Sequence, residues 1–202
     1  MLAGRVVDVA RTDSSGPTAE RFRLELASGH SIVARRVLAA TGLVDELPPI
    51  DGLAEHWGGA VIHCPFCHGY EVRDQRVVQI LTHPIGLHTA PFWRQLTDRL
   101  TIVRHEGVDA DAPGLDELRS AGVRVVDDQA VRVVSAADGG IDGVELRSGT
   151  VLEADAITIV TRFHTRIDAL SSLGVDAVPH LQRALQHTDN PAERALLEDR
   201  LA

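Results

Sequence analysis

The sequence predicts an α/β fold, and three observations lead to it. The chain has 202 residues, 44% of them hydrophobic and 24% charged, which is the composition of a globular protein with one substantial core. Short apolar runs alternate with segments of helical periodicity between residues 77 and 135. This order of strand, helix, strand, helix and strand is typical of a parallel sheet in a three-layer, Rossmann-like nucleotide-binding domain.

The charge of the chain narrows the classes of partner that it can bind. Lys and Arg number 20 and Asp and Glu number 29, so the formal net charge is −9 and argues against a nucleic-acid binder. No apolar run approaches the ~20 residues that cross a bilayer, and the first residues lack the basic and apolar regions of a signal peptide. We therefore expect a cytoplasmic protein that binds neither nucleic acid nor membrane.

The N-terminal segment is expected to consist mostly of strands. Residues 4–10 and 21–26 alternate between polar and apolar side chains on either side of a polar turn, which predicts a β-hairpin. Residues 31–40 are apolar enough for a buried strand, which ends at Thr41 and Gly42.

A stretch rich in Pro and Gly at residues 45–59 has no periodic pattern and suits a connection between domains. We place a boundary near Ile50 and divide the chain into residues 1–50, 51–160 and 161–202. In the third part, a polar cap followed by Pro191 predicts the start of a terminal helix.

The middle part carries the regular alternation. Helices are expected at 87–99, with Pro91 in the first turn, and at 115–120 before Gly122. The expected strands are 77–81, 100–103, 123–126, the hairpin of 131–135 with 144–146, and a closing buried strand at 151–160.

The two cysteines of the chain, Cys64 and Cys67, lie in the run H-C-P-F-C-H-G-Y-E. In a reducing cytosol, two thiols at this spacing are more often catalytic or metal-binding than a permanent disulfide. If the second cysteine leads into a helix, unpaired backbone N–H groups and the helix dipole favour the thiolate, which is the form that attacks disulfides. His68 follows Cys67 directly and is placed to hold a proton, because imidazole gains and loses protons near neutral pH.

Two other interpretations of these cysteines stay open at this point. They can be free structural thiols, or they can bind zinc together with His63 or His68. No second C-x-x-C and no H-x-x-x-H is present to complete four ligands, so redox use is favoured and no metal site is predicted.

The run A-A-T-G-L, a Pro-rich crossing to I-D-G-L, the run H-C-P-F-C-H-G-Y-E-V-R-D and a following strand occur in this order along the chain. Together they resemble the low-molecular-weight thioredoxin reductase family over about residues 1–178. The resemblance is to the branch with C-x-x-C-H-G, which includes thioredoxin-reductase-like flavoproteins and dithiol oxidases. It implies that Cys67 lies against the flavin ring, that Cys64 exchanges with substrate and that His68 is the acid/base.

The resemblance also implies FAD as the cofactor, with Thr41 and Gly42 close to it and residues 1–50 as the remnant of a FAD-binding domain. Family members open with a G-x-G-x-x-G loop that holds the FAD pyrophosphate and close with a Gly-Asp segment that holds the flavin. Neither occurs in this sequence. We expect a chain truncated at both ends, which purifies colourless and needs a partner subunit or a homodimer neighbour for activity.

Residues 51–160 correspond to the pyridine-nucleotide domain of that family. After the strand at 77–81, the family has a second glycine loop, whereas this chain reads L-T-H-P-I-G and keeps only Gly86 as a candidate cofactor contact. Leu and His side chains block the close backbone approach that a pyrophosphate requires. We therefore expect no NADPH binding, which fits the dithiol-oxidase branch.

The sequence thus predicts a thioredoxin-reductase-like, FAD-dependent oxidoreductase, or a fragment of one. It would perform thiol–disulfide exchange through Cys64 and Cys67 on a small-molecule or protein disulfide or dithiol. The alternative is a non-catalytic relic or binding module that has kept the fold without its FAD and NADPH sites.

Overall fold

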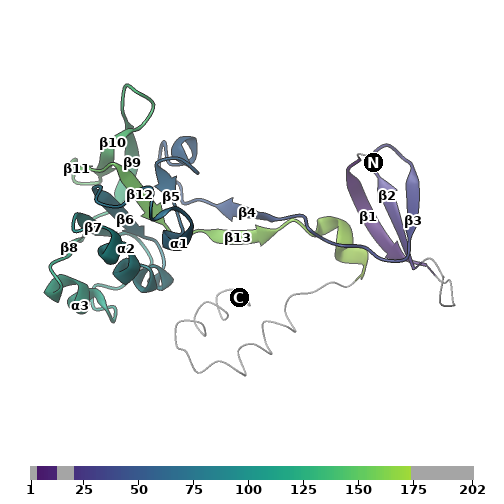
Figure 1. The fold of residues 1–202 in the computed structure, drawn as a ribbon, viewed down its shortest axis with the longest axis horizontal. Coiled ribbons are helices and arrows are strands. Elements are labelled where there is room, and N and C mark those ends of the chain that lie inside the picture. Colours follow the sequence, from purple (N-terminus) through teal and green to yellow (C-terminus); the bar gives the residue numbers. More distant parts are fainter. Residues whose placement is uncertain (1–3, 13–20, 174–202) are drawn as a thin grey trace. The chain divides into compact units, whose positions relative to one another are not determined.

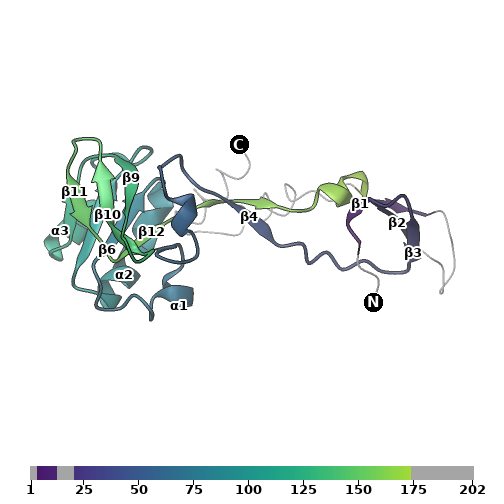
Figure 2. The same cartoon turned by 90° about the horizontal axis from the view of Figure 1, so that it is seen from above.

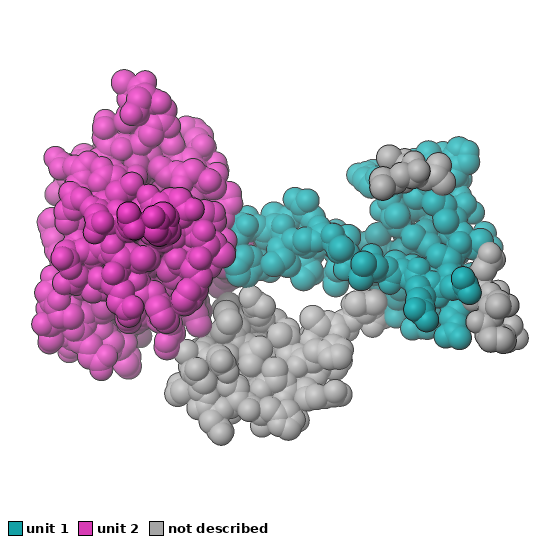
Figure 3. Space-filling view, viewed as in Figure 1, with its two compact units in different colours: residues 1–45, 163–202 teal, residues 46–162 magenta. Residues whose placement is uncertain are grey.

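A computed structural model describes residues 4–12 and 21–173 of the chain. The chain divides into two compact units, which Figure 3 shows in different colours. Unit 2 is Glu46–Arg162, and unit 1 combines Met1–Asp45 with Phe163–Ala202. The helix predicted after Pro191 lies outside the described residues, and the three-part division of the sequence stays a prediction.

Unit 2 is a three-layer α/β domain, as the sequence predicts. A five-stranded sheet with parallel neighbours runs in the order β5-β12-β6-β7-β8, and Figure 1 shows it between a three-stranded antiparallel sheet on one side and helices α2 and α3 on the other. The parallel strands are β5 (Val61–Ile62), β12 (Ala156–Ile159), β6 (Val77–Leu81), β7 (Leu100–Arg104) and β8 (Arg124–Val126). The outer layers contain β9 (Ala130–Ser135), β10 (Ile141–Leu146), β11 (Val151–Glu153), α2 (Ala90–Leu96) and α3 (Leu115–Ser120).

Strand β6 shows why the layers form. All five of its residues are buried, because successive side chains point to opposite faces and both faces are covered. Val78 and Ile80 belong to the core shared with β9 and β10, whereas Val77 and Leu81 belong to the core that contains Trp93 of α2. A continuous apolar run therefore suits this strand better than alternation does.

The closing strand predicted at 151–160 is wrong as a single element. Its first part is β11, which pairs with β10 in the antiparallel sheet, and its second part is β12, which lies between β5 and β6 in the parallel sheet. The chain changes sheets at Ala154 and Asp155. Apolarity is similar on both sides of this point, so hydrophobicity alone did not show the break.

Asp155 is held at this change of sheet by Arg76, the residue before β6. The Arg76 guanidinium donates two hydrogen bonds to the Asp155 carboxylate, at 3.0 and 2.5 Å, and a third to Glu153 at 2.6 Å. The backbones add to this pairing, because the Asp155 and Ala156 N–H groups both donate to the Arg76 carbonyl. These bonds align the start of β12 with the start of β6.

The predicted helix at 87–99 is confirmed in place but is shorter. It runs as α2 from Ala90 to Leu96, with Pro91 in its first turn, and a 3-10 helix, η2 (Pro84–His88), precedes it. Thr97 ends α2 in an extended conformation, and its hydroxyl donates to the Gln75 carbonyl at 2.6 Å. This tertiary bond favours the extended ending over a further helical turn.

The described part of unit 1 is built from strands. The predicted hairpin is confirmed as β1 (Val6–Arg11) and β2 (Phe22–Leu26), and β3 (Ser31–Ala34) extends the sheet. The buried strand predicted over 31–40 is wrong in both length and burial: β3 ends at Ala34 and is mostly exposed, and Leu38 is 90% exposed because none of the described residues of its unit forms a layer over it.

The two segments that connect the units pair with each other. They are β4 (Leu43–Glu46) and β13 (Arg162–Thr165), drawn in Figure 2 as two adjacent arrows. A 3-10 helix, η3 (Asp168–Leu173), follows in unit 1, where the Ser172 hydroxyl donates to the Val9 carbonyl at 2.7 Å. In the described part of the chain, no helix is long and apolar enough to span a bilayer.

The contact between Arg76 and Asp155 predicts a pH-dependent loss of stability. The hydrogen bond from the Arg76 side chain lowers the pKa of Asp155, so the pair stabilises the folded state above the ordinary carboxyl range. We expect Asp155→Asn to lower the melting temperature by about 3–6 °C at neutral pH. The difference from the wild type should shrink as the pH falls through the lowered pKa, because the wild-type carboxylate is then protonated as well.

Asp116→Asn is a matched control, since Asp116 also pairs with an arginine, Arg119, but its side chain is 94% exposed. It should lower the melting temperature by less than about 1 °C. Scanning calorimetry at a series of pH values makes the comparison. A deficit in Asp155→Asn that stays constant into acid pH would show that the carboxylate charge is not its cause.

Candidate functional site

The candidate site is built where β5 ends. Its backbone leads through His63 to Cys64, which caps a one-turn helix, α1 (Pro65–His68). Pro65 suits the first position, because it lacks the N–H group that a helix leaves unpaired there. The Cys64 carbonyl accepts hydrogen bonds from the N–H groups of Cys67 at 3.3 Å and His68 at 3.1 Å. The turn therefore brings both cysteines and His68 together.

Gly69 follows α1 for a reason of packing. Its φ of −65° is open to any residue, but a Cβ at this position would lie 2.2 Å from the Pro65 carbonyl oxygen and 2.4 Å from Cδ1 of Leu96 in α2. The glycine of the C-x-x-C-H-G run lets the turn that carries the two cysteines approach helix α2 closely.

The two thiols differ in acidity. Burial acts to raise the pKa of Cys64, but hydrogen bonds from the Cys67 thiol and from the N–H groups of Cys67 and Phe66 outweigh it and leave the pKa lowered. The pKa of Cys67 is raised, first by its side-chain hydrogen bond to Cys64, then by desolvation and by repulsion from the Cys64 charge. Cys64 is therefore the more acidic thiol of the pair, with Cys67 as its hydrogen-bond donor.

Exposure runs in the opposite direction to acidity. Cys67 is exposed and Cys64 is half-buried, and both are free thiols in this structure. Because the thiolate is the reacting form, acidity decides the order of reaction with a small reagent near neutral pH.

His68 is a member of a small aromatic cluster next to the thiols. Its ring lies edge-on to His63 with centroids 6.4 Å apart, and His63 stacks on Trp57 at 5.7 Å. Nδ1 of His68 is buried and has no hydrogen-bond partner among the residues described. A buried ring nitrogen without a partner is costly in an inert position and is characteristic of a group that exchanges protons.

Sequence reasoning missed the aromatic surroundings of the cysteines. Phe66, between them, is 78% exposed and contacts Phe92 of α2 with ring centroids 5.0 Å apart. Tyr70 is 71% exposed, and the Arg73 guanidinium lies 4.3 Å from the centre of its ring. The aromatic residues of the motif indicate this feature in retrospect, because exposed apolar side chains that adjoin one another are typical of binding surfaces.

The remaining predicted site residues lie elsewhere. Thr41 and Gly42 are in unit 1, whereas the cysteines and His68 are in unit 2. Both are exposed, and Gly42 has φ of +73° with open space where a side chain would stand. Its carbonyl accepts a hydrogen bond of 3.4 Å from the Arg166 N–H.

Gly86, the last candidate, lies after β6 in a loop that is closed by its own contacts. Its N–H donates to the His83 carbonyl at 3.0 Å, and its carbonyl accepts from the Gln79 side chain at 2.7 Å. Nδ1 of His83 accepts the Ile85 N–H at 3.1 Å. The backbone donors that a glycine loop would offer to a pyrophosphate are thus used within the chain.

The residues present do not form a complete site for FAD. In its described part, unit 1 contains strands and a 3-10 helix but no strand–loop–helix unit whose N–H groups could hold a pyrophosphate. In unit 2, the loop after β6 is closed by His83 and Gln79. Within the same described ranges, no group of three or more His, Cys, Asp or Glu side chains is arranged to hold a metal ion.

Comparison with known proteins gives the family context of this arrangement. No family model matches the chain. It is 25% identical over 181 residues to thioredoxin reductase tcpT of Claviceps purpurea, covering 87% of this chain and 55% of that protein. It is 26% identical over 188 residues to thioredoxin reductase sirT of Leptosphaeria maculans, covering 86% and 53% respectively.

Solved structures agree with the sequence comparison. The crystal structure of HlmI superposes with a TM-score of 0.75 at 34% identity, over 87% of this chain and 54% of that one. An oxidoreductase from Agrobacterium tumefaciens superposes with a TM-score of 0.73 at 30% identity, over 86% and 55%. The chain is thus homologous to thioredoxin-reductase-like pyridine nucleotide–disulfide oxidoreductases and spans about half of their length. That family is FAD-dependent.

The acidity of the thiols predicts how they react with an alkylating reagent. We expect Cys64 to react with iodoacetamide at lower pH than Cys67, as followed by mass spectrometry of peptides. Cys67→Ala should move the Cys64 midpoint to higher pH, because the thiolate loses the Cys67 thiol as a donor. Cys64→Ala should move the Cys67 midpoint to lower pH, because the repelling charge is removed. Identical midpoints for the two thiols in the wild type would contradict this assignment.

The closed loop after β6 predicts weak affinity for nicotinamide cofactors. Binding would have to displace His83 from the Ile85 N–H and leave the phosphates without backbone donors, which costs several kcal/mol, or roughly a thousandfold in Kd. We expect calorimetric titration of the full chain with NADPH to give no constant in the micromolar range. A low-micromolar constant would mean that the loop opens at little cost.

Proposed function

We propose that the chain performs thiol–disulfide exchange through Cys64 and Cys67, as the dithiol-bearing half of a thioredoxin-reductase-like oxidoreductase. The observation that carries this proposal is the geometry of the turn: Cys64 caps the one-turn helix α1 and Cys67 lies on it, with the Cys67 N–H donating to the Cys64 carbonyl at 3.3 Å. The hydrogen bond between the two thiols lowers the pKa of Cys64 and raises that of Cys67, which is typical of a reactive pair.

The residues divide the work as follows. In the reduced form, Cys64 is the nucleophile, because hydrogen bonds from Cys67 and Phe66 stabilise its thiolate. Cys67 resolves the mixed disulfide that Cys64 forms with substrate, since the one-turn helix holds the two thiols within hydrogen-bond reach. His68 accepts the proton of Cys67 as that thiol attacks, and returns a proton to the departing thiolate.

The exchange balances within the chain and its substrate. A substrate disulfide and the Cys64–Cys67 dithiol become a substrate dithiol and an enzyme disulfide, with two electrons and two protons transferred. In the reverse direction, a substrate dithiol reduces the enzyme disulfide and leaves as a cyclic disulfide. The closed loop after β6 favours the second direction for the complete protein, because no nicotinamide is then required.

The substrate surface fits a ligand with apolar character. Phe66 and Phe92 form an exposed ring pair beside Cys67, and Tyr70 adds a third exposed ring near the same turn. Such rings contact flat or apolar groups through dispersion and edge-to-face packing. We infer that a small dithiol or disulfide with an aromatic or apolar scaffold suits the site better than a highly charged one.

The test is titration of the fully reduced chain with 5,5′-dithiobis(2-nitrobenzoate). One equivalent should release two thionitrobenzoate ions per wild-type chain and leave a Cys64–Cys67 disulfide without bound reagent. Cys67→Ser should release one ion and keep one reagent group on Cys64, because nothing resolves the mixed disulfide. Asp116→Asn, an exposed substitution in α3, is the control and should keep the two-ion stoichiometry.

The role of His68 is tested in the same assay by the rate at which the second thionitrobenzoate ion is released. His68→Gln should leave the stoichiometry unchanged but slow the second release by about 10-fold or more near neutral pH, since general acid–base transfer typically contributes 10²–10⁴-fold. A wild-type chain that releases one ion from one equivalent of reagent and keeps the other half bound, without forming a disulfide, would favour the alternative, a non-catalytic relic or binding module. Stoichiometric quenching of flavin fluorescence on addition of FAD to the isolated chain would show that its flavin site is more complete than the described residues indicate.

A further inference from the structure

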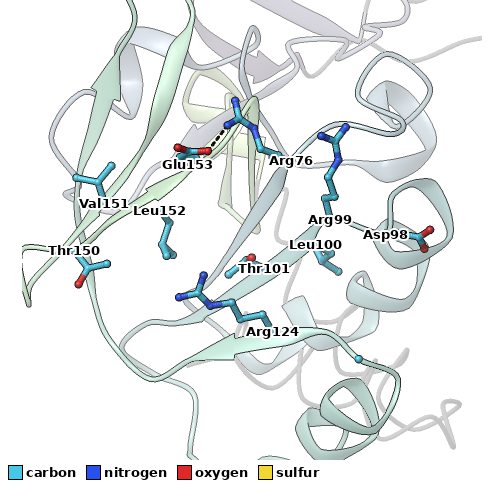
Figure 4. Close-up of a pocket in the computed structure, with 11 residues that line it drawn as sticks. Arg76, Asp98, Arg99, Leu100, Thr101, Arg124, Thr150, Val151, Leu152 and Glu153 are labelled. Carbon is cyan, nitrogen blue, oxygen red and sulfur yellow. Dashed lines mark hydrogen bonds and ion pairs between the residues drawn. The ribbon is translucent and has the colours of Figure 1, made fainter.

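A second site lies in unit 2, at the opposite end of the parallel strands from the loop after β6. A cavity of about 580 Å³ opens where β6, β7 and β8 begin, and β11 closes one side of it (Figure 4). We propose that this cavity binds a small ligand through a phosphate group or another compact oxyanion. The site is independent of the cysteines.

Three arginines line the cavity, each from the start of a neighbouring strand. Arg76 precedes β6, Arg99 precedes β7 and Arg124 begins β8, so the parallel register brings their backbones to one edge. Three guanidinium groups on one edge are notable in a chain whose formal net charge is −9. Repulsion between like charges opposes this arrangement unless an anion offsets it.

The carboxylates nearby compensate only part of this charge. Glu153 and Asp155 are both bound by Arg76, and Asp98, on the rim, pairs with Arg94 outside the cavity. Arg99 donates to the Asp74 carbonyl and makes no ion pair, although its charge helps at longer range to lower the pKa of Asp155. Among the described residues, Arg124 has neither a hydrogen bond nor an ion pair through its side chain.

Two guanidinium groups therefore remain available on the cavity wall, with the Thr101 and Thr150 side chains beside them. Figure 4 shows Arg124 extending from β8 toward the β11 side, where Thr150 lies. Guanidinium forks match the spacing of phosphate oxygens, and hydroxyl groups add neutral donors. The volume falls in the range of small-molecule sites, so there is room for an organic group attached to the anion.

The experiment titrates the full-length chain with pyrophosphate, which carries the proposed chemistry without an organic part. Isothermal calorimetry at low ionic strength should show one saturable site per chain, weakened by added salt. Arg124→Gln should weaken binding by at least about tenfold, or about 1.4 kcal/mol, because it removes a charged hydrogen-bond donor from the cavity wall. Arg132→Gln is the matched control: it removes the same charge from a side chain paired with Glu145 outside the cavity, and should leave the affinity unchanged.

Residue-level mapping gives a second readout. Pyrophosphate should slow phenylglyoxal modification of Arg99 and Arg124 but not that of Arg132, as measured by peptide mass spectrometry. Equal weakening by Arg124→Gln and Arg132→Gln would mean that the anion responds to general charge, and would overturn the proposal. The absence of saturable binding at millimolar pyrophosphate would overturn it as well. Neither result bears on the thiol chemistry, since the cysteines take no part in this assay.

Discussion

The insertion of β12 between β5 and β6 of the parallel sheet is the constraint on which the rest of unit 2 depends. It pairs with β5 on one side and β6 on the other. These two strands come first in the unit's parallel sheet along the sequence, so a strand formed late in the unit joins them. The chain changes from one sheet to the other just before β12. The hydrogen bonds between Arg76 and Asp155 hold this crossing against the start of β6. Without β12, both core layers would lose residues from their shared wall, because Ala156 and Ile157 belong to different cores.

The same strand supports the thiol chemistry. β5 contributes two residues and pairs with β12 alone among the strands of its sheet, and the chain runs from it into His63 and Cys64. The position of Cys64, the proposed nucleophile, thus depends on a strand formed almost a hundred residues later. Since α1 is a single turn, the acidity of Cys64 comes from a few directed hydrogen bonds rather than from a long helix dipole. Small movements of β5 would change those bonds directly.

Much of the fold could be predicted from the sequence because its signals are local. The apolar run at β6, the helix α3 and the hairpin of β1 and β2 follow from periodicity and turn residues alone. The change of sheet at Asp155 and the early end of β3 could not be predicted, since both depend on which layer is present to cover an apolar segment. The candidate thiols were visible as a motif, whereas their opposite acidity and the exposed ring of Phe66 required coordinates.

The two ends of the parallel strands differ in the hydrogen-bond donors that a ligand could reach. At the carboxyl end of β6, where α/β domains usually bind nucleotides, His83 accepts the Ile85 and Gly86 N–H groups that a phosphate would need. At the amino end, guanidinium groups stand on the wall of an open cavity with fewer carboxylates than they could pair with. Backbone amides can bind a phosphate closely only where glycine leaves room, whereas arginine side chains need no glycine. Replacing the glycine loop therefore removes recognition by backbone amides and leaves recognition by arginine possible. A chain that has closed its usual nucleotide edge can therefore still bind an anion at the opposite edge of the sheet.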